Sequence, residues 1–284
     1  MEEIYELELD YVKDYGYRPI YTCQVNKSGC RLILELDGSV DYRFTENNGE
    51  SMMLPLNHML ICKGKQKAIV KVYPKKGDEI LTKYAHVDLT FYYAEDKDIN
   101  LKGYKKEVVF KLPEGLEDKK LPYFESVIEF DVNVPYDYTA ELDNSKDLKN
   151  IKNIEFLIVK KYNSLRELCI NFNQVEYARQ ALHQFGKVSN TMYNNTLDEI
   201  KKGYGNGLGL VNPAFKNRVF VEIEGYDIKF YAKNKIVALW QKNLKPIMYM
   251  KGEATNNEGE TKEIEGGDPI FLYWPKESEG LKIW

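Results

Sequence analysis

Few side chains in this sequence have the types and spacing that catalysis or metal binding requires. The three histidines, His58, His86 and His183, lie far apart, and none has a second histidine or a cysteine at metal-ligand spacing. A serine nucleophile of the hydrolase type sits in a G-x-S-x-G motif, which is absent from the sequence. We therefore expect no metal site and no cofactor, and we identify no catalytic residue.

Cys169 and His183 form the cysteine–histidine pair of the predicted C-terminal domain. A nucleophilic cysteine needs an accessible thiolate and a nearby base. Cys169 instead falls on the apolar stripe of a predicted helix, so we expect it to be a small core residue. The sequence favours a binding protein over an enzyme, although it does not decide between them.

Aromatic residues are concentrated in the last 60 residues, where the sequence alternates as strands do. On a curved sheet, alternate rings can line a concave pocket, with a few charged groups to orient a ligand. The alternative is that these rings fill the core beneath the helices. The candidate ligand-binding residues of such a pocket are Glu222, Asp227, Lys229, Tyr231, Trp240 and Tyr249.

Two further segments resemble binding elements. The run GYGNGLG, from Gly203 to Gly209, follows a helix and lacks a following Lys-Ser/Thr, so we expect a flexible helix exit instead of a phosphate loop, although the loop could move at the rim of a pocket. Six lysines cluster between Lys63 and Lys76 around an alternating segment. They could bind phosphate or an acidic partner, but we favour a solvated edge strand that lysines protect from aggregation.

The first half of the chain reads as short strands separated by turn signals. Residues 3–12 alternate and predict a strand, as do residues 31–36, 67–73, 84–93, 107–112 and 124–134. No helix-period segment interrupts them. This pattern predicts a β-sandwich over residues 1–138.

The second half predicts a different architecture. Residues 135–150 are polar and form a linker, after which residues 151–172 and 178–200 carry apolar side chains at steps of three and four. The second helix should end near Gly203. Seven strand-like segments follow. We therefore predict an α+β domain over residues 145–284, with two helices packed on an antiparallel sheet.

One stretch carries a family resemblance. Between Gly49 and Pro74, Pro55-Leu56-Asn57, Gly64, the alternating Ile69, Val70 and Val72, and the closing Pro74 resemble a signature of immunoglobulin-like N-terminal domains in uncharacterised bacterial proteins. The order of helices and strands in the second half is similar to the second domain of those proteins and, loosely, to the NTF2-like fold. The resemblance implies an immunoglobulin-like sandwich and indicates fold, not activity.

Charge and composition narrow the function. Residues 1–140 carry 19 Lys+Arg and 25 Asp+Glu, which disfavours nucleic acid as a ligand and suits a basic protein partner. No run of about 18 apolar residues predicts a membrane span. The acidic start Met1-Glu2-Glu3 is unlike a signal peptide, which predicts a cytoplasmic protein, or a periplasmic one if a leader has been removed. Its four cysteines should then be reduced.

Three functions remain open. The leading hypothesis is a non-catalytic protein that binds a protein partner, such as an immunity protein that neutralises a secreted, basic bacterial toxin. The second is a small-ligand binder or an enzyme that uses a pocket in the C-terminal sheet. The third is an envelope-associated scaffold whose immunoglobulin-like domain adds a strand to a partner.

Overall fold

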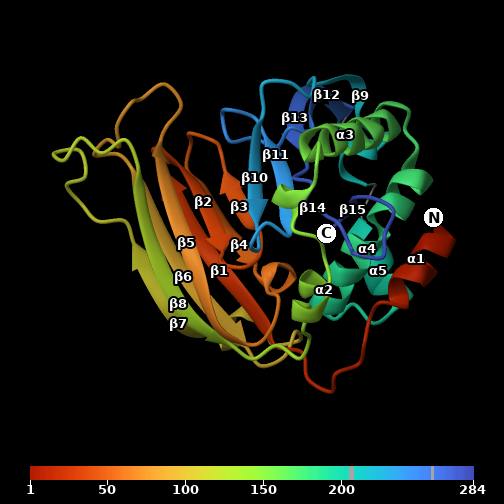
Figure 1. The fold of residues 1–284 in the computed structure, drawn as a ribbon. Coiled ribbons are helices and arrows are strands. Elements are labelled where there is room, and N and C mark those ends of the chain that lie inside the picture. Colours follow the sequence, from red (N-terminus) through yellow and green to blue (C-terminus); the bar gives the residue numbers. More distant parts are fainter. Residues whose placement is uncertain (205–207, 257–258) are drawn as a thin grey trace. The chain divides into compact units, whose positions relative to one another are not determined.

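The chain folds into two compact units, and each unit is made of segments that are separated in the sequence. The computed structural model describes residues 1–204, 208–256 and 259–284. Unit 1 consists of Met1–Lys13, Glu141–Asn190 and Asn194–Trp284, and unit 2 consists of Asp14–Ala140 and Thr191–Tyr193. In Figure 1 the strands of unit 2 run from red to yellow-green, whereas the helices and strands of unit 1 are mostly green to blue.

Unit 2 is built from two four-stranded antiparallel sheets with the orders β4-β1-β6-β7 and β3-β2-β5-β8. Its strands are β1 (Ile20–Ser28), β2 (Cys30–Leu36), β3 (Asp41–Phe44), β4 (Glu50–Pro55), β5 (Gly64–Pro74), β6 (His86–Ala94), β7 (Lys105–Lys111) and β8 (Phe124–Val132). Short 3-10 turns, Asn57–Met59 and Leu101–Gly103, lie in two of the connections.

Alternating burial along the strands of unit 2 explains why two sheets form. Every second residue is buried from Ala68 onward in β5 and from Ile128 onward in β8, and the ring of Phe91 on β6 lies 4.9 Å from the ring of Phe130 on β8. Such packing is consistent with a β-sandwich. The immunoglobulin-like part of the fold prediction is nevertheless wrong, because β1 and β2 lie in different sheets, whereas the first two immunoglobulin strands share one.

The lysine-rich strand β5 is not an edge strand, contrary to expectation. It lies between β2 and β8, and its lysines face acidic residues on those neighbours. Lys71 Nζ lies 2.5 Å from Glu35 Oε2 of β2, and Lys67 Nζ lies 3.7 Å from Glu129 Oε1 of β8. Cross-strand ion pairs therefore account for these charges without an edge or an anionic ligand.

Unit 1 contains most of the helical residues. Its helices are α1 (Glu2–Leu9), α3 (Ile154–Ile170), α4 (Gln174–Met192), whose last two residues belong to unit 2, and α5 (Leu197–Tyr204). A short helix, α2 (Thr139–Asp143), spans the change of unit at residue 141, and Leu148–Asn150 and Gly209–Val211 form 3-10 turns. No helix among the described residues has both the length and the apolarity needed to cross a membrane.

Two helix predictions need correction. The segment predicted as a strand at residues 3–12 is helix α1, in which Ile4 and Glu8, four residues apart, are the buried positions. The helix expected to reach Gly203 is broken, because Tyr193 adopts a positive φ of 59°. Helix α5 then restarts after Thr196, whose hydroxyl accepts a hydrogen bond from the Glu199 amide, a standard N-terminal cap.

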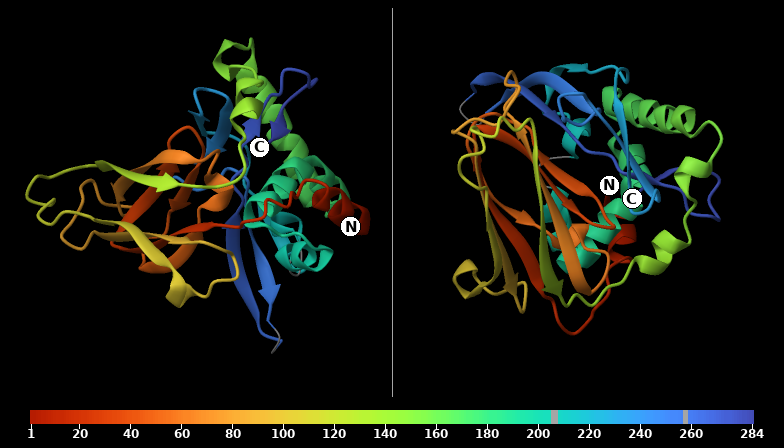
Figure 2. Two further views of the ribbon diagram at one scale, coloured as in Figure 1. Left: turned by 90° about the horizontal axis from the view of Figure 1, so that it is seen from below. Right: turned by 60° about the vertical axis from the view of Figure 1, so that its left-hand side comes forward.

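The α+β prediction for the C-terminal residues is wrong, because their strands form two separate antiparallel sheets instead of one helix-covered sheet. One has the order β10-β11-β14-β15 and the other β13-β12-β9. The strands are β9 (Lys216–Phe220), β10 (Asp227–Tyr231), β11 (Ile236–Trp240), β12 (Tyr249–Thr255), β13 (Thr261–Gly267), β14 (Leu272–Tyr273) and β15 (Lys282–Ile283). Figure 2 shows β12 and β13 as the long blue hairpin. The chain as a whole is rich in antiparallel sheets.

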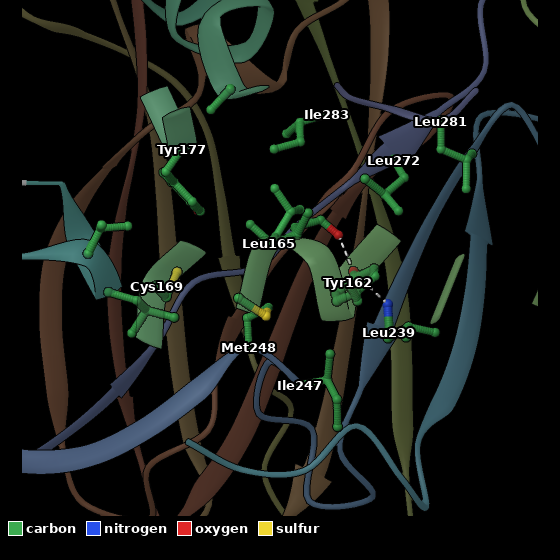
Figure 3. Close-up of a cluster of buried hydrophobic side chains, with 14 of the residues drawn as sticks. Tyr162, Leu165, Cys169, Tyr177, Leu239, Ile247, Met248, Leu272, Leu281 and Ile283 are labelled. Carbon is green, nitrogen blue, oxygen red and sulfur yellow. Dashed lines mark hydrogen bonds between the residues drawn. The ribbon is translucent and has the colours of Figure 1, made fainter. Parts of the chain in front are cut away.

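Helix α3 supplies the centre of the unit 1 core, as its apolar stripe predicted. Ile158, Tyr162, Leu165 and Cys169 are its buried residues. The Tyr162 hydroxyl connects the segment before β14 to strand β11. It donates a hydrogen bond to the Ile270 carbonyl and accepts one from the Leu239 amide at 2.9 Å (Figure 3). Cys169 is fully buried, and burial raises its thiol pKa to about 12, so it is a core residue as expected.

Candidate functional site

A pocket of about 360 Å³ lies within unit 1, among α1, α4, α5 and the segment between β13 and β14. Its volume is in the range of small-molecule sites. Most of its wall is apolar, and the apolar side chains come from Tyr177, Phe185, Val188, Ile200, Leu208 and Ile270. Gly203 and Gly209 of the glycine run border it; Gly205 and Gly207 lie outside the described residues.

Glu8 of helix α1 is the first acidic group in this pocket. Its side chain is 3% exposed and accepts two hydrogen bonds, from the Ser189 hydroxyl at 2.5 Å and from the Tyr204 hydroxyl at 2.5 Å. Burial raises the pKa of Glu8, and the two hydrogen bonds oppose that rise without cancelling it. Helices α1, α4 and α5 are thus joined at one carboxyl group.

Asp268, just after β13, is the second acidic group of the pocket. Its Oδ2 atom accepts a hydrogen bond from the Leu210 amide at 3.2 Å, and burial raises its pKa. The carboxyl group lies directly over Gly209, which has a φ of +43°; a Cβ atom there would be 2.3 Å from Oδ2. Glycine is therefore required at position 209 both for its backbone angle and for the room that Asp268 occupies.

Within the described part of the chain, the two carboxyl groups have no basic partner. None of the residues that line the pocket is a lysine, arginine or histidine. Across residues 1–204, 208–256 and 259–284, no cationic side chain forms an ion pair with Glu8 or Asp268. A raised carboxyl pKa in a cleft is typical of functional sites, because burial without a counter-charge costs stability. Such groups can donate a proton or bind a cation.

A second polar cluster in unit 1 is packed closely. Glu141 Oε1 lies 3.0 Å from His183 Nε2 and accepts a hydrogen bond from the Tyr273 hydroxyl at 2.7 Å. Burial alone would raise the pKa of Glu141, but His183, Tyr273 and Lys187 hold it below its ordinary value. Lys187 is 3% exposed, its Nζ lies 3.3 Å from the centroid of the Trp284 ring, and burial lowers its pKa well below the usual range. We interpret this cluster as stabilising the fold.

The six residues predicted to bind a ligand lie apart from the pocket. Glu222 is exposed and pairs with Arg166 at 2.7 Å, and Asp227 pairs with Lys242 on the surface. Buried Tyr231 and Trp240 join through a hydrogen bond of 3.0 Å. Lys229 and Tyr249 contact residues close to them in the sequence. Lys229 Nζ lies over the Tyr231 ring, and the Tyr249 hydroxyl accepts a hydrogen bond from Lys245 Nζ.

The prediction for His86 can be compared directly with the structure. His86 is an exposed residue on β6, as expected, with Nε2 at 3.5 Å from Asp88. Within the described ranges, no three His, Cys, Asp or Glu side chains are arranged to hold a metal ion. The four cysteines form no disulfide.

Sequence reasoning missed both carboxyl groups of the pocket. A helical interpretation of residues 2–9 would have placed Glu8 on the same face as Ile4, which is a weak signal for a buried acid. Nothing local marks Asp268. No protein-family model, no curated protein and no solved structure matches this chain. The geometry of the pocket is therefore the basis for assigning a function.

Proposed function

We propose that this protein binds a small organic molecule in the pocket of unit 1. One observation carries the proposal: an apolar pocket of about 360 Å³ holds two carboxyl groups, Glu8 and Asp268, that lack a basic neighbour in the described part of the chain. Leaving such groups in an apolar wall costs folding free energy. A ligand that forms hydrogen bonds or ion pairs with these carboxyl groups offsets that cost. Proteins usually keep such unfavourably placed groups because they serve a function.

A pocket-filling variant tests this proposal. Val188→Phe places a larger ring in the pocket, and Val175→Phe, on the exposed part of the same helix, is the matched control. A library of small aliphatic and aromatic fragments is screened by ligand-observed NMR and by thermal shift. We expect hits with the wild type and the control, and their loss with Val188→Phe. Hits that bind all three proteins equally would contradict the proposed site.

A second proposal retains the protein-binding role, including that of an immunity protein. It is supported by the acidic balance of residues 1–140 and by four apolar side chains of unit 2 that are at least half exposed: Tyr84, Leu101, Val109 and Val127. An acidic balance suits a basic partner, and exposed apolar side chains are common at sites of protein interaction. Co-expression with the product of a neighbouring toxin gene tests it: we expect a stoichiometric complex that weakens with salt, and separate elution of the two proteins would refute it.

A further inference from the structure

The pocket of unit 1 has a definite charge preference, and this deepens the proposed function on which it rests. We infer that the ligand is an organic cation, a primary or secondary amine carrying an apolar group. Its ammonium lies against a carboxyl group of the pocket lining, Asp268 or Glu8, and its apolar group lies against Phe185, Val188 and Ile200.

The hydrogen-bonding capacity of the two carboxyl groups supports a donor-rich ligand. Each oxygen of Glu8 accepts one protein hydrogen bond, and Asp268 accepts one, at Oδ2. Among the described residues, no donor reaches Oδ1 of Asp268. A carboxylate offers about four acceptor positions, and an ammonium offers three donors and no acceptor. The unfilled positions therefore match an ammonium better than a hydroxyl, which would fill one of them.

The charge of the pocket lining disfavours an anionic ligand. The pocket lining contains two acids and no base, so an anionic ligand would place like charges together in an apolar cavity. A bare metal ion is also a poor fit, because calcium takes six to eight oxygen ligands and most of this wall is carbon. An ammonium attached to an apolar group satisfies both parts of the wall at once.

The same geometry predicts a pH dependence of amine binding. Burial favours the protonated form of both acids in the empty pocket, and no other charged side chain is part of the lining. An ammonium favours the ionised form. The affinity for an amine should therefore rise with pH above the ordinary carboxyl pKa of about 4, as the two groups ionise, whereas the affinity for a neutral analogue should not change.

Three probes of one shape test the inference by isothermal titration calorimetry on the full chain: phenethylamine, phenethyl alcohol and phenylacetate. We expect the amine to bind at least about tenfold more tightly than the alcohol, and the acid not to bind. Asp268→Asn should abolish most of the amine's advantage and leave alcohol binding unchanged. Glu8→Gln should act similarly. The matched controls are Asp143→Asn and Glu6→Gln, which change exposed acids of unit 1 outside the pocket lining.

The outcomes separate this inference from the proposed function. Equal binding of amine and alcohol, or an amine affinity that Asp268→Asn does not change, would overturn the cation assignment and leave a neutral-ligand pocket. Binding of phenylacetate alone would also overturn the cation assignment and would indicate a pocket that binds anions. If no probe and no library fragment binds, both the inference and the proposed function fail. Far-ultraviolet circular dichroism of each variant confirms folding, and Asp268→Asn retains the test if Glu8→Gln disrupts the helix contacts.

Discussion

Tyr162 provides the most direct test of how unit 1 is held together. Its ring is fully buried on α3, and its hydroxyl connects the backbones of two segments, at Leu239 on β11 and at Ile270. Tyr162→Phe keeps the ring and removes only the oxygen. The substitution leaves one buried amide and one buried carbonyl without this partner.

The structure gives the size of the expected loss. An unsatisfied buried polar group costs about 1–3 kcal/mol, and Tyr162→Phe creates two of them, so the free energy of unfolding should fall by about 2–6 kcal/mol. Partial relaxation of the two backbone segments favours the lower end. Because whole domains are stable by only about 5–15 kcal/mol, the effect is large enough to measure reliably.

Two assays measure the effect. Urea denaturation gives the change in free energy of unfolding, and native-state hydrogen exchange reports the Leu239 amide directly. Tyr177→Phe is the control, since Tyr177 is a buried tyrosine of the same core whose hydroxyl joins no pair of strands in the described residues. A loss below about 0.5 kcal/mol with unchanged exchange at Leu239 would refute the reasoning, since surface changes commonly have that size.

Three further predictions follow from the pocket and the cysteines. Gly209→Ala should lower the melting temperature by an amount equivalent to about 2 kcal/mol, because Gly209 has a φ of +43° and a Cβ there would overlap Asp268. The control Gly203→Ala has open space around it in helix α5 and should be neutral or stabilising. Equal effects of the two substitutions would contradict this geometry. Because the pKa of Asp268 is raised in the folded protein, this residue contributes to the free energy of unfolding at low pH, and the contribution is lost as pH rises through the raised pKa. The melting temperature of Asp268→Asn relative to wild type should therefore increase from about pH 4 to pH 8. A constant difference would contradict the burial of this acid. Partly exposed Cys62 should react with a thiol reagent far faster than Cys169 in the native protein, and the same reagent should label all four cysteines after denaturation; uniform native reactivity would contradict the core assignment.

Much of the local structure could be predicted from the sequence, because it depends on patterns within one element. The stripe of residues 151–172 predicted helix α3 and the burial of Cys169, and both are observed. Strand alternation in residues 31–36, 67–73 and 124–134 predicted β2, β5 and β8. In each case the period of the apolar residues matches the geometry of the element that buries them.

The errors arise where one local pattern suits two structures. Residues 3–12 alternate, but Ile4 and Glu8 also lie one helical turn apart, and packing in unit 1 selects the helix. The position of β5 in the middle of its sheet and the division of the C-terminal strands into two sheets depend on pairing between distant segments. Periodicity identifies a strand but carries no information about its partners.

By itself, the sequence determined most of the extended segments and helix α3 with its buried stripe, and it showed that familiar catalytic motifs are absent. Only the tertiary structure brought Glu8 and Asp268, from opposite ends of the chain, into one apolar pocket. The physical reason is that a carboxyl group acquires an unusual pKa from its surroundings, not from its sequence neighbours. Those surroundings come from α4, α5 and the turn at Gly209, and exist only once the unit has folded.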